Sequence, residues 1–162
     1  MTNASSIVVA SAGETESDSN GISLLLIKFS DAVDERRPNA IAQLFTEHGT
    51  FRPGDKGVKG RDAIQEFYEA RLSDARRRTR HVWSNLLIQP VLPRIAQFRA
   101  VLTNYAFEPA ISEQAMQVRL GNVSGSCEQG IDGTWRFAEH LYERIFAASL
   151  ALTAAPSPNT RT

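Results

Sequence analysis

Residues 80–89, RHVWSNLLIQ, have the composition of a β-strand, in which every second side chain points to the same face. The alternation predicts two faces: His81, Trp83, Asn85 and Leu87 on one, and Val82, Ser84, Leu86 and Ile88 on the other. The first face combines an imidazole, an indole and a carboxamide, a mixture typical of a pocket wall that binds and orients a ligand. The same residues would also suit the half-exposed outer face of a sheet, so the strand alone leaves both interpretations open.

Upstream of this strand, apolar residues recur at helical spacing in three segments. They predict helices over residues 22–34, 38–45 and 61–72, the second of which has a proline in its first turn. Between the last two helices, FTEHGTF (45–51) reads as a short strand and RPGDKGVKG (52–60) as a glycine-rich loop.

Downstream of residue 89, the pattern is strand after strand, over 95–107, 116–127 and 134–146. The parity of the apolar positions changes at Gly121-Asn122, which predicts a β-bulge. The sequence IDGT at 131–134 is typical of a hairpin turn. The last three strands, together with residues 80–89, therefore form an antiparallel meander of four long strands.

Helices that precede the long strands indicate the α+β class, with a curved, mostly antiparallel sheet and three N-terminal helices packed on its concave face. A long, twisted and bulged sheet curls, and helices across its concave side can leave an enclosed pocket. We expect the His81 face of the strand to look into that pocket. The domain is predicted to span residues 21–147, between a mobile N-terminal tail (1–20) and a flexible C-terminal tail (148–162), both poor in apolar pattern.

The composition excludes several classes of protein. The chain has 162 residues, of which 42% are hydrophobic, enough for one domain with its own core. Because 18 Lys and Arg balance 18 Asp and Glu, no net charge attracts nucleic acid or an anionic membrane, and no apolar run is long enough to span a bilayer. Residues 1–20 lack the pattern of a signal peptide, and the single Cys127 excludes an internal disulfide and fits a cytoplasmic location.

Five segments spread over residues 21–145 have the pattern of one known family: FSDAVDERRPNAIAQLF, FTEHGTF, GVKGRDAIQEFY, RHVWSNLLI and DGTWRFAEH. In order, they resemble a first helix that ends in aspartate and is followed by a short second helix, a short first strand, a glycine-led third helix, an "RH…SN" strand and a closing strand. The chain thus resembles the SnoaL-like group of the nuclear transport factor 2-like superfamily, which has a cone-shaped, cystatin-like fold.

This resemblance implies acid/base chemistry. In dehydratase-like members a pocket aspartate and histidine carry the reaction, assisted by tyrosine; by position, Asp34 matches the aspartate and His81 the histidine. Phe29 stands where the bile-acid 7α-dehydratase has a tyrosine, so that particular reaction is not implied. A neutral imidazole is a good base near pH 7, and with Asp34 it could remove a proton beside a carbonyl, leading to isomerisation or dehydration.

The remaining pocket residues would bind the substrate. Asn85 could hold a substrate oxygen, and Phe29, Trp83 and Tyr68 would supply apolar walls. On an ideal helix Asp34 lies off the apolar stripe, so it reaches the pocket only if the helix ends there; the alternative is a solvated carboxylate paired with Arg36 or Arg37.

Other candidates are weaker. His48, beside a glycine at a turn, and His140, on the closing strand, are expected at the surface. A three-histidine metal site formed by these two residues and His81 has no ligand spacing in its favour. The run Arg76–Arg78 with Arg80 could bind phosphate or nucleic acid, but reads better as a solvated turn or a partner contact.

We therefore expect a cofactor-independent and metal-independent lyase or isomerase, dehydratase-like, that binds a small apolar oxygenated molecule. A polyketide-type cyclase is chemically related, and a non-catalytic small-molecule-binding or assembly module of the same fold is the alternative from another class. The outer sheet face, which carries Val101 and Tyr105, is the expected homodimer surface. No nucleic acid or membrane partner is expected.

Overall fold

The computed structural model describes residues 12–152. Its elements follow the order helix, helix, strand, strand, helix and four strands: α1 (Ala12–Asp34), α2 (Pro38–Gln43), β1 (Phe45–Arg52), β2 (Val58–Lys59), α3 (Arg61–Arg71), β3 (Arg78–Leu92), β4 (Ile95–Phe107), β5 (Ala115–Gln129) and β6 (Trp135–Ala151). The predicted α+β class is confirmed. No helix within residues 12–152 is long and apolar enough to cross a membrane.

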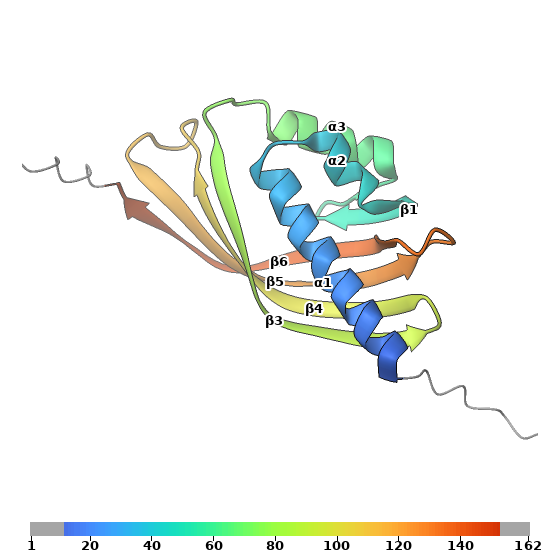
Figure 1. Ribbon diagram of the computed structural model, residues 1–162. Helices are drawn as coiled ribbons and strands as arrows, with labels where there is room; N and C mark the ends of the chain where they lie inside the picture. Colours follow the sequence, from blue (N-terminus) through green and yellow to red (C-terminus); the bar gives the residue numbers. More distant parts are fainter. Residues whose placement is uncertain (1–11, 153–162) are drawn as a thin grey trace, which may run out of the picture.

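All six strands form one curved sheet in the order β2-β1-β6-β5-β4-β3. Strands β3 to β6 pair antiparallel, as the meander predicts, whereas β1 runs parallel to β6 and makes the sheet mixed. Figure 1 shows α1 lying across the concave face, with α2 and α3 together beside β1 at one end of the sheet. The predicted arrangement of three helices on the concave face of a mostly antiparallel sheet is therefore confirmed.

Packing of α1 on the sheet follows from its apolar stripe. Its buried side chains recur every three or four residues and so lie on one side of the helix: Ile22, Leu25, Leu26, Phe29 and Val33. They join a core with Phe45 of β1 and Phe137 of β6, which have no exposed surface. Each fully buried side chain of this size contributes roughly 1.5–3 kcal/mol, so the stripe fixes the position of α1.

Two elements extend beyond the predicted domain boundaries at residues 21 and 147. The helix α1 begins at Ala12, where a mobile tail had been expected up to residue 20, and β6 continues to Ala151, beyond residue 147. The polar residues before Ile22 can continue the helix, because the apolar stripe from Ile22 onward already holds it on the sheet. Pairing with β5, which reaches Ala115↔Ala151, holds the end of β6. The remainder of the predicted tails, residues 1–11 and 153–162, lies outside the described residues.

A β-bulge divides β3 into two halves. Asn85 and Leu86 stand opposite the single residue Ala100 of β4, and Asn85 has the left-handed φ of 53°. One extra residue reverses the alternation, so Leu86 packs against the core while Leu87 is 54% exposed. The prediction that Asn85 shares a face with His81 was wrong, because it assumed uninterrupted alternation. The bulge that was predicted at Gly121-Asn122, in β5, coincides with a register shift between Leu120 and Gly121.

Candidate active site

A cavity of about 1070 Å³ lies between the concave face of the sheet and the helices. This volume is near the upper end of the range for small-molecule sites. Its apolar wall is made by Phe29, Val33, Phe51, Phe67, Tyr68 and Leu102. Exposed residues of the loop 52–56 and of β6 at 143–144 also line it, so the cavity opens to solvent between them and is not the enclosed pocket that had been expected.

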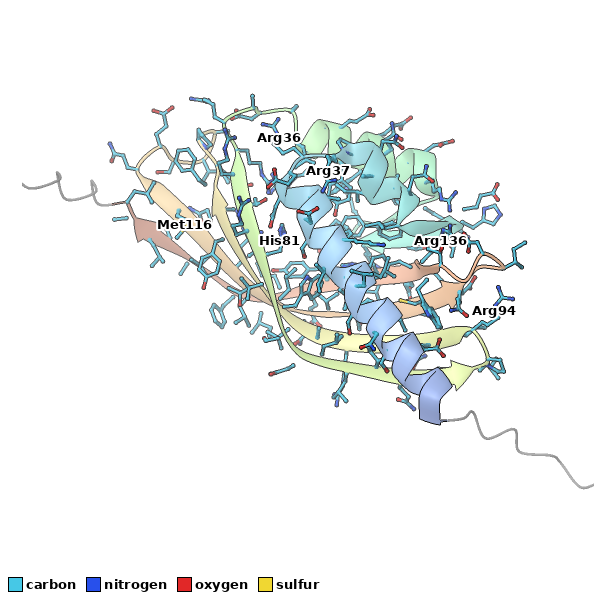
Figure 2. The ribbon with its side chains drawn as sticks, viewed as in Figure 1. Arg36, Arg37, His81, Arg94, Met116 and Arg136 are labelled. Carbon is cyan, nitrogen blue, oxygen red and sulfur yellow. The ribbon has the colours of Figure 1, made fainter. Side chains whose placement is uncertain are left out.

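The expected contact between Asp34 and His81 is present. The Asp34 carboxylate accepts hydrogen bonds from the His81 ring Nδ1 at 2.6 Å, from the His81 backbone N–H at 3.0 Å and from the Thr79 hydroxyl at 2.7 Å. Figure 2 shows His81 between β3 and the C-terminal half of α1. Arg36 and Arg37 bond elsewhere, to the carbonyl of Leu72 and to Asp31, so the alternative of a solvated Asp34 ion pair was wrong.

The end of α1 explains how Asp34 reaches the sheet. Asp34 is the last residue of the helix, and Arg36, with a φ of 59°, turns the chain away. One turn earlier, the Ser30 hydroxyl accepts a hydrogen bond from the indole N–H of Trp83. A helical turn advances about 5.4 Å and two strand residues advance about 6.6 Å. Because these lengths are similar, Ser30 can contact Trp83 while Asp34, one turn later, contacts His81.

Both nitrogens of the His81 ring are hydrogen-bonded. Its Nε2 accepts a hydrogen bond of 2.9 Å from the Asn104 side-chain amide, whose oxygen in turn accepts one of 3.4 Å from Arg119. In this arrangement Nδ1 donates its proton to Asp34, and the lone pair of Nε2 faces the Asn104 amide. Burial alone would raise the pKa of Asp34, but the hydrogen bonds from His81 and Thr79 and the His81 charge outweigh it and lower that pKa.

A second polar cluster surrounds Glu108, just after β4, and was not predicted. Its carboxylate is 4% exposed and accepts hydrogen bonds from Arg71 at 2.5 Å, from Arg77 at 3.0 Å and from Arg119. Burial favours a raised pKa, yet the three arginines lower the pKa of Glu108 to about 2. The expectation of a solvated arginine run was wrong for Arg77, which is 8% exposed. Arg77 and Thr79 have the same parity as His81, so continuing the strand alternation towards the N-terminus would have placed them on the inner face.

His140 was expected at the sheet surface, and this was wrong. A register shift between Ser126 and Cys127 reverses the alternation on β6 and turns the His140 ring inward, where it is 1% exposed. Its ring lies 4.7 Å from that of Phe29, and neither of its nitrogens has a hydrogen-bond partner among the described residues. Burial lowers the pKa of His140 to about 3, so the ring is neutral at pH 7.

The other predicted site residues divide into two groups. Phe29 and Tyr68 line the cavity, and both side chains are buried. Trp83 packs beside the core rather than in the cavity wall, and Asn85 is exposed at the bulge, so the prediction that Asn85 holds a ligand oxygen has no support. His48 is exposed, as predicted. Within residues 12–152 no group of three or more His, Cys, Asp or Glu residues could hold a metal ion.

Comparisons with known proteins agree with this fold. Solved structures with the same fold include a candidate scytalone dehydratase from Novosphingobium aromaticivorans, with 22% identity, a TM-score of 0.78 and coverage of 94% of this chain and 99% of that one. A type 2 hexachlorocyclohexane dehydrochlorinase (LinA) has 17% identity and a TM-score of 0.79 over 91% and 99%. ActVI-ORFA from Streptomyces coelicolor has 16% identity and a TM-score of 0.69 over 80% and 98%.

A search among curated protein sequences found no match. The family model of the SnoaL-like domain, in contrast, matches residues 14–140, which include most of α1, the whole of β3 and the histidine of β6. The match spans both members of the Asp34–His81 pair, and the cone-shaped sheet with helices on its concave face is the fold of the nuclear transport factor 2-like superfamily. The chain belongs to the family of SnoaL-like domains.

Proposed function

We propose that this protein is a cofactor-independent lyase or isomerase of the dehydratase type, which acts by acid/base catalysis on a small, largely apolar, oxygenated molecule. The observation that carries the proposal is the hydrogen bond between Asp34 and His81, because His81 also lines a cavity of ligand size. Support comes from the SnoaL-like family and from the shared fold with proteins described as a scytalone dehydratase and a dehydrochlorinase.

In the proposed reaction His81 Nε2 removes a proton from a carbon beside a carbonyl group, and the C–H electrons form the enolate. Asp34 stabilises the imidazolium that results. The proton then returns to a different carbon, which completes an isomerisation, or is given to a β-hydroxyl that leaves as water while the carbon–carbon double bond forms. Burial raises the pKa of Tyr68, so its phenol stays protonated and can donate a hydrogen bond to the enolate oxygen.

A second candidate function is a non-catalytic small-molecule-binding or assembly module. One observation favours it: the basic nitrogen of His81 is already occupied by the amide of Asn104. Acid/base chemistry requires a ligand that displaces this amide, whereas ligand binding alone does not. The two functions therefore differ in whether bound molecules exchange protons.

Proton exchange in D₂O tests the proposal. Ketones with a β-hydroxyl group would be incubated with the protein, and NMR would follow both the loss of the α-proton signal and the formation of the unsaturated product. We expect His81→Asn and Asp34→Asn each to reduce the rate about 10²–10⁴-fold. His48→Asn, which alters an exposed histidine outside the cavity, is the matched control and should leave the rate unchanged.

The alternative has its own signature in the same experiment. If the ketones shift the NMR signals of cavity residues but exchange no faster than in buffer, the protein binds without catalysis and the enzyme proposal fails. An equal loss of rate in His48→Asn and His81→Asn would also contradict it, because the effect would then not come from the pair.

We further propose a homodimer that forms through the outer face of the sheet. Val101 and Tyr105 lie on this face, where Val82, Leu87 and Tyr105 are 51%, 54% and 38% exposed. Tyr105→Lys should shift the protein to a monomer in light scattering. Gln43→Lys on α2 is the control, and a wild-type protein that is monomeric at tens of micromolar would contradict the proposal.

The only cysteine, Cys127, is buried and free. This supports, as a proposal, a location in the reducing cytoplasm.

A further inference from the structure

Three arginines line the same cavity as His81 and share one buried carboxylate. Arg71 comes from the end of α3, Arg77 from the segment before β3 and Arg119 from β5, and all three donate to Glu108. Three guanidinium charges face one carboxylate charge, so the cluster carries a net charge of +2. The whole chain has a net charge of zero, so the cluster is a local concentration of positive charge.

The other charged residues of the cavity do not neutralise this cluster. At the mouth, Arg52, Lys56 and Arg144 are accompanied by Asp55 and Glu143, and Arg52 also pairs with Glu139. The cluster therefore keeps its net positive charge within the cavity, and such a charge gains free energy from a nearby anion.

The cluster also has hydrogen-bond donors to spare. A guanidinium group has five N–H donors, and Arg71 uses one of its nitrogens, Nη2, for Glu108. The Arg71 side chain is 43% exposed and that of Arg119 is 18% exposed, so a ligand in the cavity can reach both.

We propose that the ligand of this cavity carries a carboxylate, which binds to Arg71 and Arg119. Arginine binds planar two-oxygen anions through parallel N–H donors, and Glu108, with Arg71 and Arg77 on one oxygen and Arg119 on the other, shows that the cluster accepts such a group. The inference deepens the proposed function, on which its catalytic meaning rests, by naming the substrate class as an organic acid with an apolar, oxygenated body.

The position of Arg119 connects the anion to the proposed chemistry. Arg119 contacts Asn104, and Asn104 contacts His81 Nε2. A carboxylate on Arg119 therefore lies two side chains from the base, while Phe29, Phe51 and Tyr68 offer the apolar surface that the rest of the ligand would cover. The same contact provides a way to withdraw the Asn104 amide from His81 when the anion binds.

The test uses benzoate and benzamide, two probes of matched shape that differ in charge. Protein NMR would follow the backbone and arginine side-chain signals of cavity residues during each titration. We expect benzoate to bind at least tenfold more tightly than benzamide, and the ratio to fall below threefold in Arg119→Gln and in Arg71→Gln. Arg99→Gln, on the exposed outer face of β4, removes the same charge outside the cavity and should leave the ratio unchanged.

Several results would overturn the inference. Equal binding of the two probes, or no saturable shift with either, would show that the cavity has no preference for a carboxylate. Displacement of benzoate by an equal concentration of inorganic phosphate would assign the cluster to phosphate instead. If Arg119→Gln does not fold, the two variants of the more exposed Arg71 decide. Arg71→Gln should lower the ratio, and Arg71→Lys, which keeps the charge, should recover part of it.

Repeating the titration in His81→Asn separates this inference from the proposed function. The benzoate preference should persist there, although the variant lacks the proposed base. If the wild type exchanges protons but binds benzoate no better than benzamide, the carboxylate site alone is refuted. If the wild type prefers benzoate but exchanges no protons, the enzyme proposal alone is refuted.

Discussion

His81 and His140 line the same cavity, and their surroundings differ in every respect that matters for proton transfer. Both ring nitrogens of His81 are hydrogen-bonded, one to the Asp34 carboxylate and one to the Asn104 amide. His140 is enclosed by aromatic rings, and neither of its nitrogens has a partner among the described residues. An imidazole acquires a role as a base from the groups that hold its protons, and the residue type alone does not provide it.

The two regions also differ in how they are stabilised. Around His81 the polar groups continue through Asn104 and Arg119 to Glu108, so desolvation is offset by a connected set of hydrogen bonds. Around His140 stabilisation comes from aromatic packing, which must also offset two unpaired nitrogens. Removing a polar group should therefore destabilise the first region and stabilise the second.

Glu108→Gln should have the largest effect, a loss of about 3–5 kcal/mol in the free energy of unfolding measured with urea, because it leaves three guanidinium groups without their shared anion. The pKa of Glu108 is lowered from 4.5 to about 2, so its contribution is complete above pH 4.5 and is lost as the pH falls towards 2. The variant should lack this acid-dependent loss. Glu113→Gln, 69% exposed and paired with Arg76, is the control and should cost less than about 1 kcal/mol. Equal stability of the two variants would contradict the description of the polar region.

His140→Phe should have the opposite sign. Replacing a ring with two unpaired nitrogens should raise the free energy of unfolding at pH 7 by about 1–2 kcal/mol. Because the pKa of His140 is lowered from 6.5 to about 3, the unfolded chain takes up a proton first, and the wild type loses stability as the pH falls from 6.5 towards 3. The variant should lose this dependence, whereas His48→Phe at an exposed position should retain it. A variant less stable than the wild type at pH 7 would mean that the ring nitrogens do have partners.

Ser30→Ala tests the junction between the two regions and should have the smallest effect. Trp83 lies with its ring 6.2 Å from His140 and donates its indole N–H to Ser30, one turn before Asp34. Loss of the acceptor should lower the free energy of unfolding by about 1 kcal/mol. Ser23→Ala, which removes only a hydrogen bond within α1, is the control. A change no larger than that of the control would show that this contact does not hold the helix end against β3.

The fold was largely predictable from the sequence, because its helices and strands have strong periodic patterns and follow one another in a simple order. The contact between Asp34 and His81 came from the family resemblance and not from periodicity, since Asp34 lies off the apolar stripe of its helix. The helix in fact ends at that residue, which lets the carboxylate turn to the strand.

The missed features share a physical cause, which is that they depend on contacts distant in the sequence or on irregular backbone. Arginine is rarely buried, and Arg77 is buried only because Glu108, 31 residues later, accepts its hydrogen bond. The inward orientation of His140 depends on a register shift against β5. Asn85 offered one local signal, because asparagine tolerates the left-handed conformation better than most residues.

The bulge in β3 has a consequence for how this gene could change during evolution. Deleting Asn85 would remove the extra residue and restore regular alternation, with Leu86 and Ile88 still on the inner face and Leu87 still on the outer face. Substitutions at Asn85 leave the two faces as they are. This position should therefore accept either a change or a loss of its residue, and the turn at 131–134, which lies outside the strand pairing, can likewise gain or lose residues without altering either face of the sheet.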